Sequence, residues 1–212
     1  MGYPFLLFDL DGTLVDSLDD LAVSINLLRE ELGLDALARE RVAGAIGDGA
    51  ALLVKRCLPE HPYAPRSVER FLQIYDDHLL DHTAPYPGIP ELLESLAGCK
   101  LGVVTNKPRA EAQRILVGAG LAGHFQTVVG GDCAAARKPD AAPLQLALQR
   151  LGHQAEPALM VGDHHTDLYA GRAAGIDTCF CLWGMGHDDG LTTTLRAASP
   201  AKLQQLLTGC SP

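Results

Sequence analysis

The chain has 212 residues, of which 47% are apolar and 20% are charged, and its formal net charge is −9 at pH 7. A chain of this size can bury a sizeable core, either as one domain or as one domain with an insertion. The acidity argues against sequence-independent binding to nucleic acid or to anionic membranes, because those surfaces repel an acidic protein that has no Lys/Arg run to serve as a basic patch.

The N-terminal segment predicts a cytoplasmic location. It reaches Asp9 without a basic stretch followed by an apolar one, and no apolar stretch approaches the roughly 18 residues that span a bilayer. The six cysteines include no Cys-x-x-Cys pair, and a chain of this length does not need disulfides to stabilise its core. We expect a soluble protein with reduced cysteines, present as a monomer or a homodimer and without a nucleic-acid or membrane partner.

The first predicted strand covers residues 5–8 and ends just before Asp9. Asp9 and Asp11 lie two residues apart, so strand alternation can direct both carboxylates to one site at the carboxyl edge of a sheet, where α/β proteins place ligands. Two close carboxylates do not both ionise easily, so one pKa should be raised, which leaves a nucleophile beside an acid. This pair suits phosphoryl transfer: Asp9 attacks phosphorus, and Asp11 protonates the leaving alkoxide and later deprotonates a water molecule.

The interval from residue 17 to residue 83 shows helical periodicity and no convincing strand. Apolar residues recur at steps of three and four from Leu18 to Leu32, which predicts an amphipathic helix. Two more helices are expected over 39–58 and 67–82, separated by the proline-rich segment 61–65. We therefore predict a helical cap of residues 17–83, inserted into a core of residues 1–16 and 84–212, with hinges at 15–17 and 83–88.

Four further apolar runs predict strands, and the helix-length segments between them give the pattern of βαβ units that feed a parallel sheet. Pro108 and Pro143 suit the first turns of two such helices, and Gly120 and Gly152 suit their ends. The predicted fold class is therefore α/β, with a Rossmann-like parallel sheet core and the inserted helical cap. The four runs are 101–105, 127–129, 158–161 and 178–182.

Polar groups follow these later strands and supply what an anionic nucleophile needs when it approaches an anionic phosphate. Thr105 and Asn106 offer a hydroxyl, an amide and backbone N–H groups near the start of a helix, a favourable phosphate environment. Lys138 can balance the charge of the nucleophile and the phosphate. Asp163 can complete an oxygen-rich magnesium site, and Asp167, four residues later on a helix, can support that site directly or through water.

These segments resemble, in order and each after a predicted strand, the four motifs of the haloacid dehalogenase superfamily over nearly the whole chain. The resemblance implies that Mg²⁺ is held by the side chains of Asp9 and Asp163 and by the backbone carbonyl of Asp11. It also implies that the phosphate is held by the side chains that follow the second strand and by the lysine. These phosphate-binding residues are Thr105, Asn106 and Lys138.

A finer resemblance is to bacterial phosphoglycolate phosphatases, over segments 11–17, 46–50, 104–108 and 129–132. It implies that the cap closes over the site and contacts the part of the substrate beyond the phosphate. The loop of Gly47, Asp48 and Gly49 could then bind a small hydroxy-carboxylate, with Lys55 or Arg56 available to pair with its charge. The expected reaction is the Mg²⁺-dependent hydrolysis of 2-phosphoglycolate, through an aspartyl phosphate, to glycolate and phosphate.

Three alternatives remain open at this point. A sugar-phosphate phosphatase or a phosphomutase would share Asp9 and Asp11, because the acid/base step is the same. A signalling receiver domain also combines an acidic pocket, a threonine, a lysine and Mg²⁺, although the helical insertion argues against it. His164 and His165 suggest a zinc or iron site, but no second His/Cys cluster supplies further ligands, and adjacent side chains point in different directions.

Overall fold

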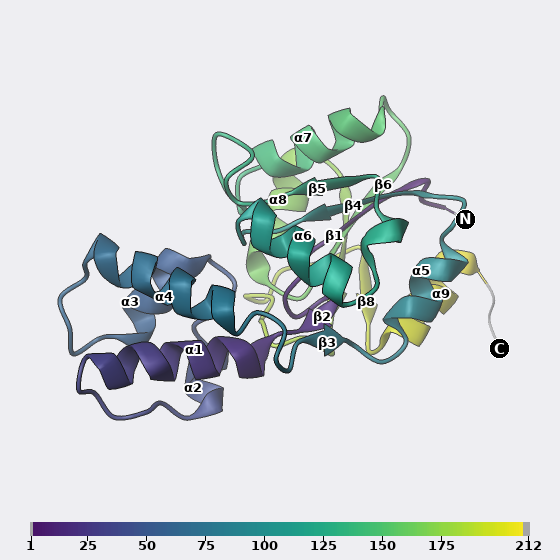
Figure 1. Cartoon of the computed structure of the whole chain (residues 1–212). Coiled ribbons are helices and arrows are strands. Elements are labelled where there is room, and N and C mark those ends of the chain that lie inside the picture. Colours follow the sequence, from purple (N-terminus) through teal and green to yellow (C-terminus); the bar gives the residue numbers. More distant parts are fainter. Residues whose placement is uncertain (1, 210–212) are drawn as a thin grey trace.

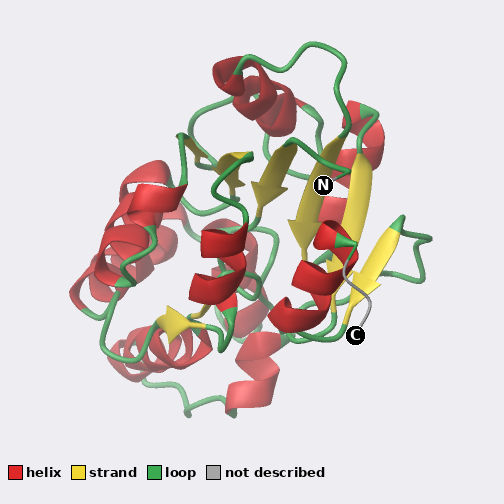
Figure 2. Ribbon diagram, turned by 90° about the vertical axis from the view of Figure 1, so that its right-hand side faces the viewer, coloured by secondary structure: helices red, strands yellow, loops and turns green. Residues whose placement is uncertain are grey.

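The computed structural model describes residues 2–209, so that Cys210 lies outside the described residues. A six-stranded sheet with the order β5-β4-β1-β6-β7-β8 forms its centre, and every neighbouring pair of strands is parallel. Figures 1 and 2 show this sheet with helices on both of its faces. The strands are β1 (Phe5–Phe8), β4 (Lys100–Val104), β5 (Thr127–Val129), β6 (Ala158–Gly162), β7 (Asp177–Cys181) and β8 (Leu195–Ala197).

The two faces of the sheet bury separate apolar clusters, as the alternation along β1 shows. Phe5 and Leu7 pack with residues of α7 (Ala142–Leu151) and α8 (His165–Ala174), whereas Leu6 and Phe8 join the larger cluster on the opposite face. That larger cluster includes residues of α5 (Ile89–Ser95), α6 (Arg109–Gly118) and α9 (Pro200–Thr208). The 3₁₀ helix η1 (Ala122–His124) precedes β5. The predicted α/β class with a parallel sheet is confirmed.

Four helices lie between residues 17 and 83, and in Figure 1 they gather to one side of the sheet. They are α1 (Leu18–Glu31), α2 (Arg39–Ala43), α3 (Ala50–Cys57) and α4 (Pro65–Asp77), and α1 packs against α2 and α4. The single helix predicted over 39–58 is wrong. Gly47 and Gly49 have φ values of 117° and 91°, a backbone conformation that no helix contains, so the segment breaks into α2, a loop and α3.

The chain passes between the sheet and these helices twice, at β2 (Val15–Asp16) and β3 (Ala84–Pro85), which pair antiparallel. Both strands fall at the predicted hinges, although no strand was expected there. The helix predicted over 67–82 begins earlier and ends at Asp77. None of the helices within residues 2–209 has the length and apolar character needed to cross a bilayer. The division into core and cap at residues 17 and 83 stays a prediction.

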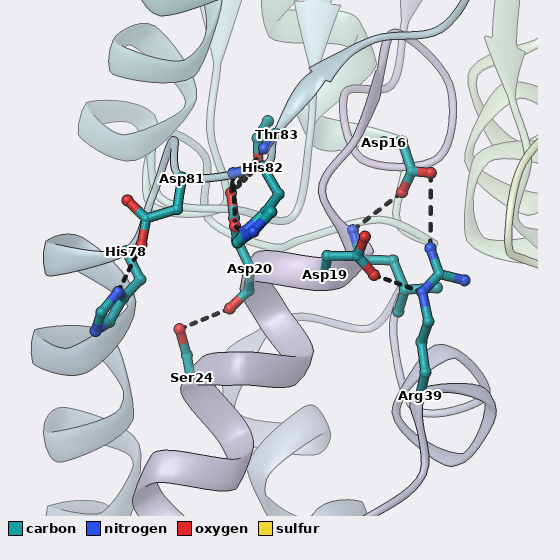
Figure 3. Close-up of polar contacts among 10 residues, drawn as sticks. Asp16, Asp19, Asp20, Ser24, Arg39, His78, Asp81, His82 and Thr83 are labelled. Atoms are coloured by element: carbon teal, nitrogen blue, oxygen red, sulfur yellow. Dashed lines mark hydrogen bonds and ion pairs between the residues drawn. The ribbon is translucent and has the colours of Figure 1, made fainter.

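One buried carboxylate joins the first helix to the returning segment, as Figure 3 shows. The side chain of Asp20 on α1 is inaccessible to solvent and accepts hydrogen bonds from the backbone N–H groups of His82 and Thr83. The Thr83 hydroxyl donates a further bond of 2.6 Å, and Nδ1 of His82 lies 2.9 Å from Asp20 Oδ1. Burial opposes the charge of Asp20, but the bonds from Thr83 and His82 outweigh it and lower the pKa of this carboxyl.

Replacing Asp20 with alanine is expected to lower the free energy of unfolding by about 2–3 kcal/mol, because it removes the buried, charged acceptor of several hydrogen bonds from His82 and Thr83. The lowered pKa of Asp20 stabilises the folded state above the ordinary pKa of 3.8, and this stabilisation is lost as the pH falls below that value. The bond to Asp20 raises the pKa of His82 above 6.5, so the stabilisation from protonated His82 is lost as the pH rises through that raised value. Urea unfolding of wild type and variant should therefore differ most between about pH 4 and pH 6.5.

A matched control is Asp19→Ala, which breaks the exposed ion pair between Asp19 and Arg39 that Figure 3 also shows. Exposed pairs contribute at most about 1 kcal/mol. A difference between wild type and the Asp20 variant that stayed constant from pH 3 to pH 9 would contradict the assignment.

Candidate active site

The site residues predicted in the core meet near the carboxyl ends of three neighbouring strands. In the sheet, β4 and β5 lie on one side of β1, and β6, β7 and β8 lie on the other side. The strand order therefore reverses at β1. Ligands bind at such reversal points in open α/β sheets. Asp9 follows β1, Thr105 follows β4 and Asp163 follows β6, and the backbone N–H of Asp9 still donates to the carbonyl of Val161 at 2.9 Å.

Lys138 forms the positive centre of this group. Its side chain is 1% exposed, and its Nζ lies 2.9 Å from Oδ1 of Asp9, 2.6 Å from Oδ1 of Asp167 and 2.7 Å from the carbonyl oxygen of Val104. Burial disfavours its charge, but Asp167 and Asp9 outweigh burial and raise its pKa above the ordinary value. The sequence prediction that this lysine balances the charge of Asp9 agrees with these contacts.

Asp167 is the third residue of α8 and is completely buried. Its Oδ1 accepts the bond from Lys138, and its Oδ2 accepts one from the backbone N–H of His164. Gly162 makes room for it, because a Cβ at that position would lie 2.2 Å from Asp167 Oδ2. Both oxygens of Asp167 therefore already have partners that fix Lys138 and the start of the helix.

Asp163 is held on both oxygens by groups from different segments. Thr13 donates its hydroxyl to Oδ1 at 2.9 Å, and the backbone N–H groups of Met185 and Gly186 donate to Oδ2 at 3.0 and 2.9 Å. Gly12 has a φ of 82°, and a Cβ there would lie 2.1 Å from Asp163 Oδ2. The turn after Asp11 therefore requires glycine both for its backbone conformation and for the close approach of this carboxylate.

The carboxylates of Asp9, Asp163 and Asp167 fit a hard divalent cation. Their ligand oxygens lie within 4.8 Å of one another, and all three residues are buried. Burial, together with the neighbouring Asp9 and Asp167, raises the pKa of Asp163 to about 8. Lys138 contacts Asp9 and Asp167 but is a single cation among three buried acids, so the cluster carries excess negative charge, and a cation that prefers oxygen ligands, such as Mg²⁺, would offset it.

The pKa of Asp9 is also raised, to about 6. Burial raises it most, Lys138 opposes that effect, and Asp167 and Asp11 raise it further. The sequence predicted one raised pKa in the pair of Asp9 and Asp11, and the raised value falls on the expected nucleophile. Lys138 alone does not restore the ordinary pKa of Asp9, which is a second reason to expect a cation beside it.

Asp11 faces a different set of groups from Asp9. Ser17 donates its hydroxyl to Asp11 Oδ1 at 2.5 Å, and Nζ of Lys107 lies 3.2 Å from the same oxygen. Lys107 also donates to the hydroxyl of Tyr75 on α4 at 2.5 Å, and its Nζ lies 4.3 Å from the centre of that ring. Burial disfavours the charge of Lys107, but Asp11 outweighs burial and raises the pKa of this amine. Lys107 is therefore a fixed cation beside Asp11.

Thr105 and Asn106 are both buried after β4. The Thr105 hydroxyl accepts a bond from the backbone N–H of Lys107 at 3.2 Å. Asn106 donates its amide to the carbonyl oxygens of Gly47 and Lys138, at 3.1 and 2.9 Å, while its Oδ1 is buried without a hydrogen-bond partner. Asn106 therefore joins the loop of Gly47, between α2 and α3, to the loop of Lys138, between β5 and α7.

A cavity of about 70 Å³ lies between the sheet edge and the cap helices. Asp9, Asp11, Thr105, Asn106 and Asp163 line its core side, and the cap contributes mainly apolar side chains. Those cap residues include Ile46, Leu53, Phe71 and Leu72, together with the backbone of Gly47 and Gly49.

The charged cap residues proposed from the sequence lie elsewhere. Asp48 and Arg56 form an ion pair with each other at 2.6 Å, and within residues 2–209 neither of them, nor Lys55, lines the cavity. The cation that does line it is Lys107, and Glu111 lines it as well. Lys107 directly follows Thr105 and Asn106, and that adjacency to the predicted phosphate-binding segment was the signal that could have identified it.

This combination of a parallel sheet, an inserted helical segment and buried aspartates at the reversal point defines a class of hydrolase. The chain belongs to the haloacid dehalogenase-like hydrolase family, which matches residues 6–181. Its relatives include a phosphoglycolate phosphatase from Chromobacterium violaceum, 40% identical over 94% of both chains, and one from Aquifex aeolicus, 37% identical over 95% of both. The predicted superfamily and enzyme class are confirmed, and the receiver-domain alternative has no support.

A solved structure is similar over almost its full length. The crystal structure of a predicted phosphoglycolate phosphatase from Haemophilus somnus superimposes with a TM-score of 0.88, at 28% identity, and the match covers 98% of this chain and 99% of that one. The cap helices as well as the sheet are therefore shared with that protein.

Proposed function

We propose that this hydrolase is a Mg²⁺-dependent phosphatase that acts on small phosphate monoesters, with 2-phosphoglycolate as its preferred substrate. The observation that carries the proposal is the position of Asp9, a buried carboxylate beside Lys138 and a cluster of acidic oxygens, with a second carboxyl, Asp11, lining the same cavity. The names of the relatives from Chromobacterium violaceum and Aquifex aeolicus support this substrate.

In the proposed reaction, one oxygen of Asp9 forms a bond to phosphorus while the bond from phosphorus to the leaving oxygen breaks. Asp11 donates its proton to that oxygen, so glycolate leaves with its hydroxyl restored. The ionised Asp11 then takes a proton from a water molecule, which attacks phosphorus and releases Asp9 and inorganic phosphate. Lys138, Thr105 and Asn106 bind the phosphate oxygens.

Asp9 and Asp163 are proposed to hold the metal ion through their side chains, together with the backbone carbonyl of Asp11. When bound, Mg²⁺ would neutralise charge that develops on the phosphate oxygens. Asp167 would act indirectly, because its two oxygens already bind Lys138 and the backbone of His164. Thr13 and the N–H groups of Met185 and Gly186 would hold the Asp163 carboxylate in position.

We further propose that Lys107, rather than Lys55 or Arg56, pairs with the carboxylate of the substrate, while Gly47 and Gly49 contact it through their backbone. Lys107 lines the cavity on the side of Asp11, where the leaving group must lie if Asp11 protonates it. A cavity of about 70 Å³ with apolar walls also suits a two-carbon leaving group better than a sugar.

The test is phosphate release from a panel of esters in the presence of Mg²⁺, for wild type and for Lys107→Met. Wild type is expected to hydrolyse 2-phosphoglycolate with the highest kcat/KM. The variant should lose about 10- to 100-fold more kcat/KM on 2-phosphoglycolate than on an ester with a neutral leaving group, the loss expected for a hydrogen bond to a charged group. Comparing the two esters cancels any general effect of Lys107 on Asp11.

Lys55→Met is the matched control, since Lys55 is an exposed lysine of α3 that does not line the cavity. It should leave the preference among esters unchanged. An equal loss on charged and neutral esters in the Lys107 variant would refute the carboxylate contact, and no hydrolysis of any ester by wild type would refute the phosphatase.

One observation favours the alternative of a sugar-phosphate phosphatase. Glu111 lines the cavity, and its Oε2 is buried without a hydrogen-bond partner, so it could accept a bond from a substrate hydroxyl. The same panel separates the two substrates. A cytoplasmic location and a monomeric or homodimeric state complete the proposal and stay predictions from the sequence.

A further inference from the structure

Three histidines meet beside the active site, although the sequence analysis expected no third ligand near His164 and His165. The third is His187, from the loop after β7, and ligand nitrogens of the three rings all lie within 4.8 Å of one another. The ring centres of His164 and His165 are 4.1 Å apart, and those of His165 and His187 are 4.9 Å apart. The expectation that adjacent histidines point apart was wrong, because the start of α8 turns both rings to the same side.

Two carboxylates lie near these rings, and one of them is within hydrogen-bond distance of a ring nitrogen, as the outer partner of a metal-bound histidine is. Nδ1 of His187 lies 2.9 Å from Asp189 Oδ1, so a bond there would leave the other nitrogen of His187 for a metal. Nε2 of His165 lies 3.9 Å from Asp48 Oδ1, and its Nδ1 lies 3.7 Å from Asp189 Oδ2. Asp189 places negative charge where a cation would bind, and Asp48 faces the same position with one oxygen while its other oxygen pairs with Arg56.

The histidine cluster also contains a polar atom that the protein leaves without a partner. Nδ1 of His165 is buried and has no hydrogen-bond partner, its distance to Asp189 being too long for one. Buried nitrogens normally have a partner, because leaving one without a hydrogen bond is costly. Three imidazoles in contact, one of them with an unpartnered nitrogen, are better explained by a ligand than by packing.

We propose that His164, His165 and His187 bind a divalent cation of the Zn²⁺ class, at a site separate from the carboxylate cluster of Asp9. Imidazole nitrogen suits Zn²⁺, Ni²⁺ or Cu²⁺, whereas Mg²⁺ prefers oxygen ligands. The two sites therefore select different metals by their donor atoms. Asp48 and Asp189 offset the unfavourable position of a cation near the N-terminus of α8.

The proposed site links the cap to the sheet. Asp48 belongs to the loop between α2 and α3, whose neighbours Gly47 and Gly49 line the active-site cavity. His164 lines the same cavity, and a Cβ at Gly47 would lie 2.4 Å from His164 Nε2. A cation bound by the histidines would therefore lie at the rim of the cavity and attract the cap loop through Asp48.

The test is Zn²⁺ binding by the untagged protein, measured by competition with a chromophoric chelator in a large excess of Mg²⁺, which keeps the carboxylate site occupied. We expect one Zn²⁺ per chain. Loss of a residue that only hydrogen-bonds to a metal ligand weakens metal binding about 10- to 100-fold. His187→Ala removes a direct ligand, so it should weaken Zn²⁺ binding by at least about 100-fold. His187 has a side chain that is 61% exposed, so its replacement should leave the fold intact.

Two controls separate the proposed site from other metal-binding groups. His124→Ala, at the distant helix η1, should bind Zn²⁺ as wild type does. Asp9→Asn disrupts the carboxylate cluster and should also retain the Zn²⁺. The proposal is overturned if wild type binds no Zn²⁺ in excess Mg²⁺, if His187→Ala binds as tightly as wild type, or if Asp9→Asn loses the ion while His187→Ala keeps it.

Discussion

Replacing Asp9 with asparagine is expected to lower kcat for phosphate release by at least about 10⁴-fold, the scale of loss seen when a catalytic nucleophile is removed. Asparagine occupies nearly the same volume and can still accept a hydrogen bond from Lys138, so the fold and the cavity should survive. Its neutral amide cannot form the aspartyl phosphate. Steady-state kinetics on 2-phosphoglycolate, together with substrate binding measured by calorimetry, should therefore show binding without turnover.

Two further variants serve as a comparison and a control for this experiment. Asp11→Asn removes the proposed acid and base, whose contribution is typically about 10²- to 10⁴-fold, so its activity should fall less than that of the Asp9 variant. Asp77→Asn changes an exposed aspartate at the end of α4 and should leave kcat unchanged. Activity within tenfold of wild type in Asp9→Asn would mean that another group attacks phosphorus.

Replacing Lys138 with methionine is expected to abolish turnover and to lower the free energy of unfolding by about 3–5 kcal/mol, because breaking a buried ion pair leaves an uncompensated charge. Methionine keeps most of the apolar stem but removes the cation between Asp9 and Asp167, two buried acids that then repel each other. Urea unfolding in the presence of a chelator, so that no metal substitutes for the lysine, measures this loss directly.

The stability that Lys138→Met loses relative to wild type is expected to increase with pH. Without Lys138, the folded protein should raise the pKa of Asp9 further above its ordinary value, so protonation relieves the repulsion. The difference in stability between variant and wild type should therefore be larger at pH 8 than at pH 5. Lys202→Met, which removes an exposed lysine of α9, is the control and should change stability by less than about 1 kcal/mol. A loss of stability that does not depend on pH would indicate that the variant is destabilised by lost packing rather than by the lost charge of Lys138.

The elements that the sequence predicted well are those with strong local patterns. The apolar runs before Asp9, Thr105 and Asp163 are buried strands, and their order along the chain is enough to predict a parallel sheet. The edge strand β8 was missed because it has only three residues and includes the half-exposed Arg196, which gives no clear strand pattern. The break between α2 and α3 was also missed, although the three glycines of residues 44–49 were its signal.

The sequence by itself predicted the carboxylates of the candidate site, because Asp9 and Asp163 each follow directly on a strand whose pattern is local, and the carboxyl ends of parallel strands share one edge. Lys138 lies in the loop between β5 and α7, and its charge and its place in the resemblance predicted it. The tertiary structure alone decided which residues complete the site. Lys107 faces Asp11 because α4 brings Tyr75 against it, and His187 joins two distant histidines because a loop folds back over α8. Such contacts join segments far apart in the chain, and no local pattern encodes a distance between them.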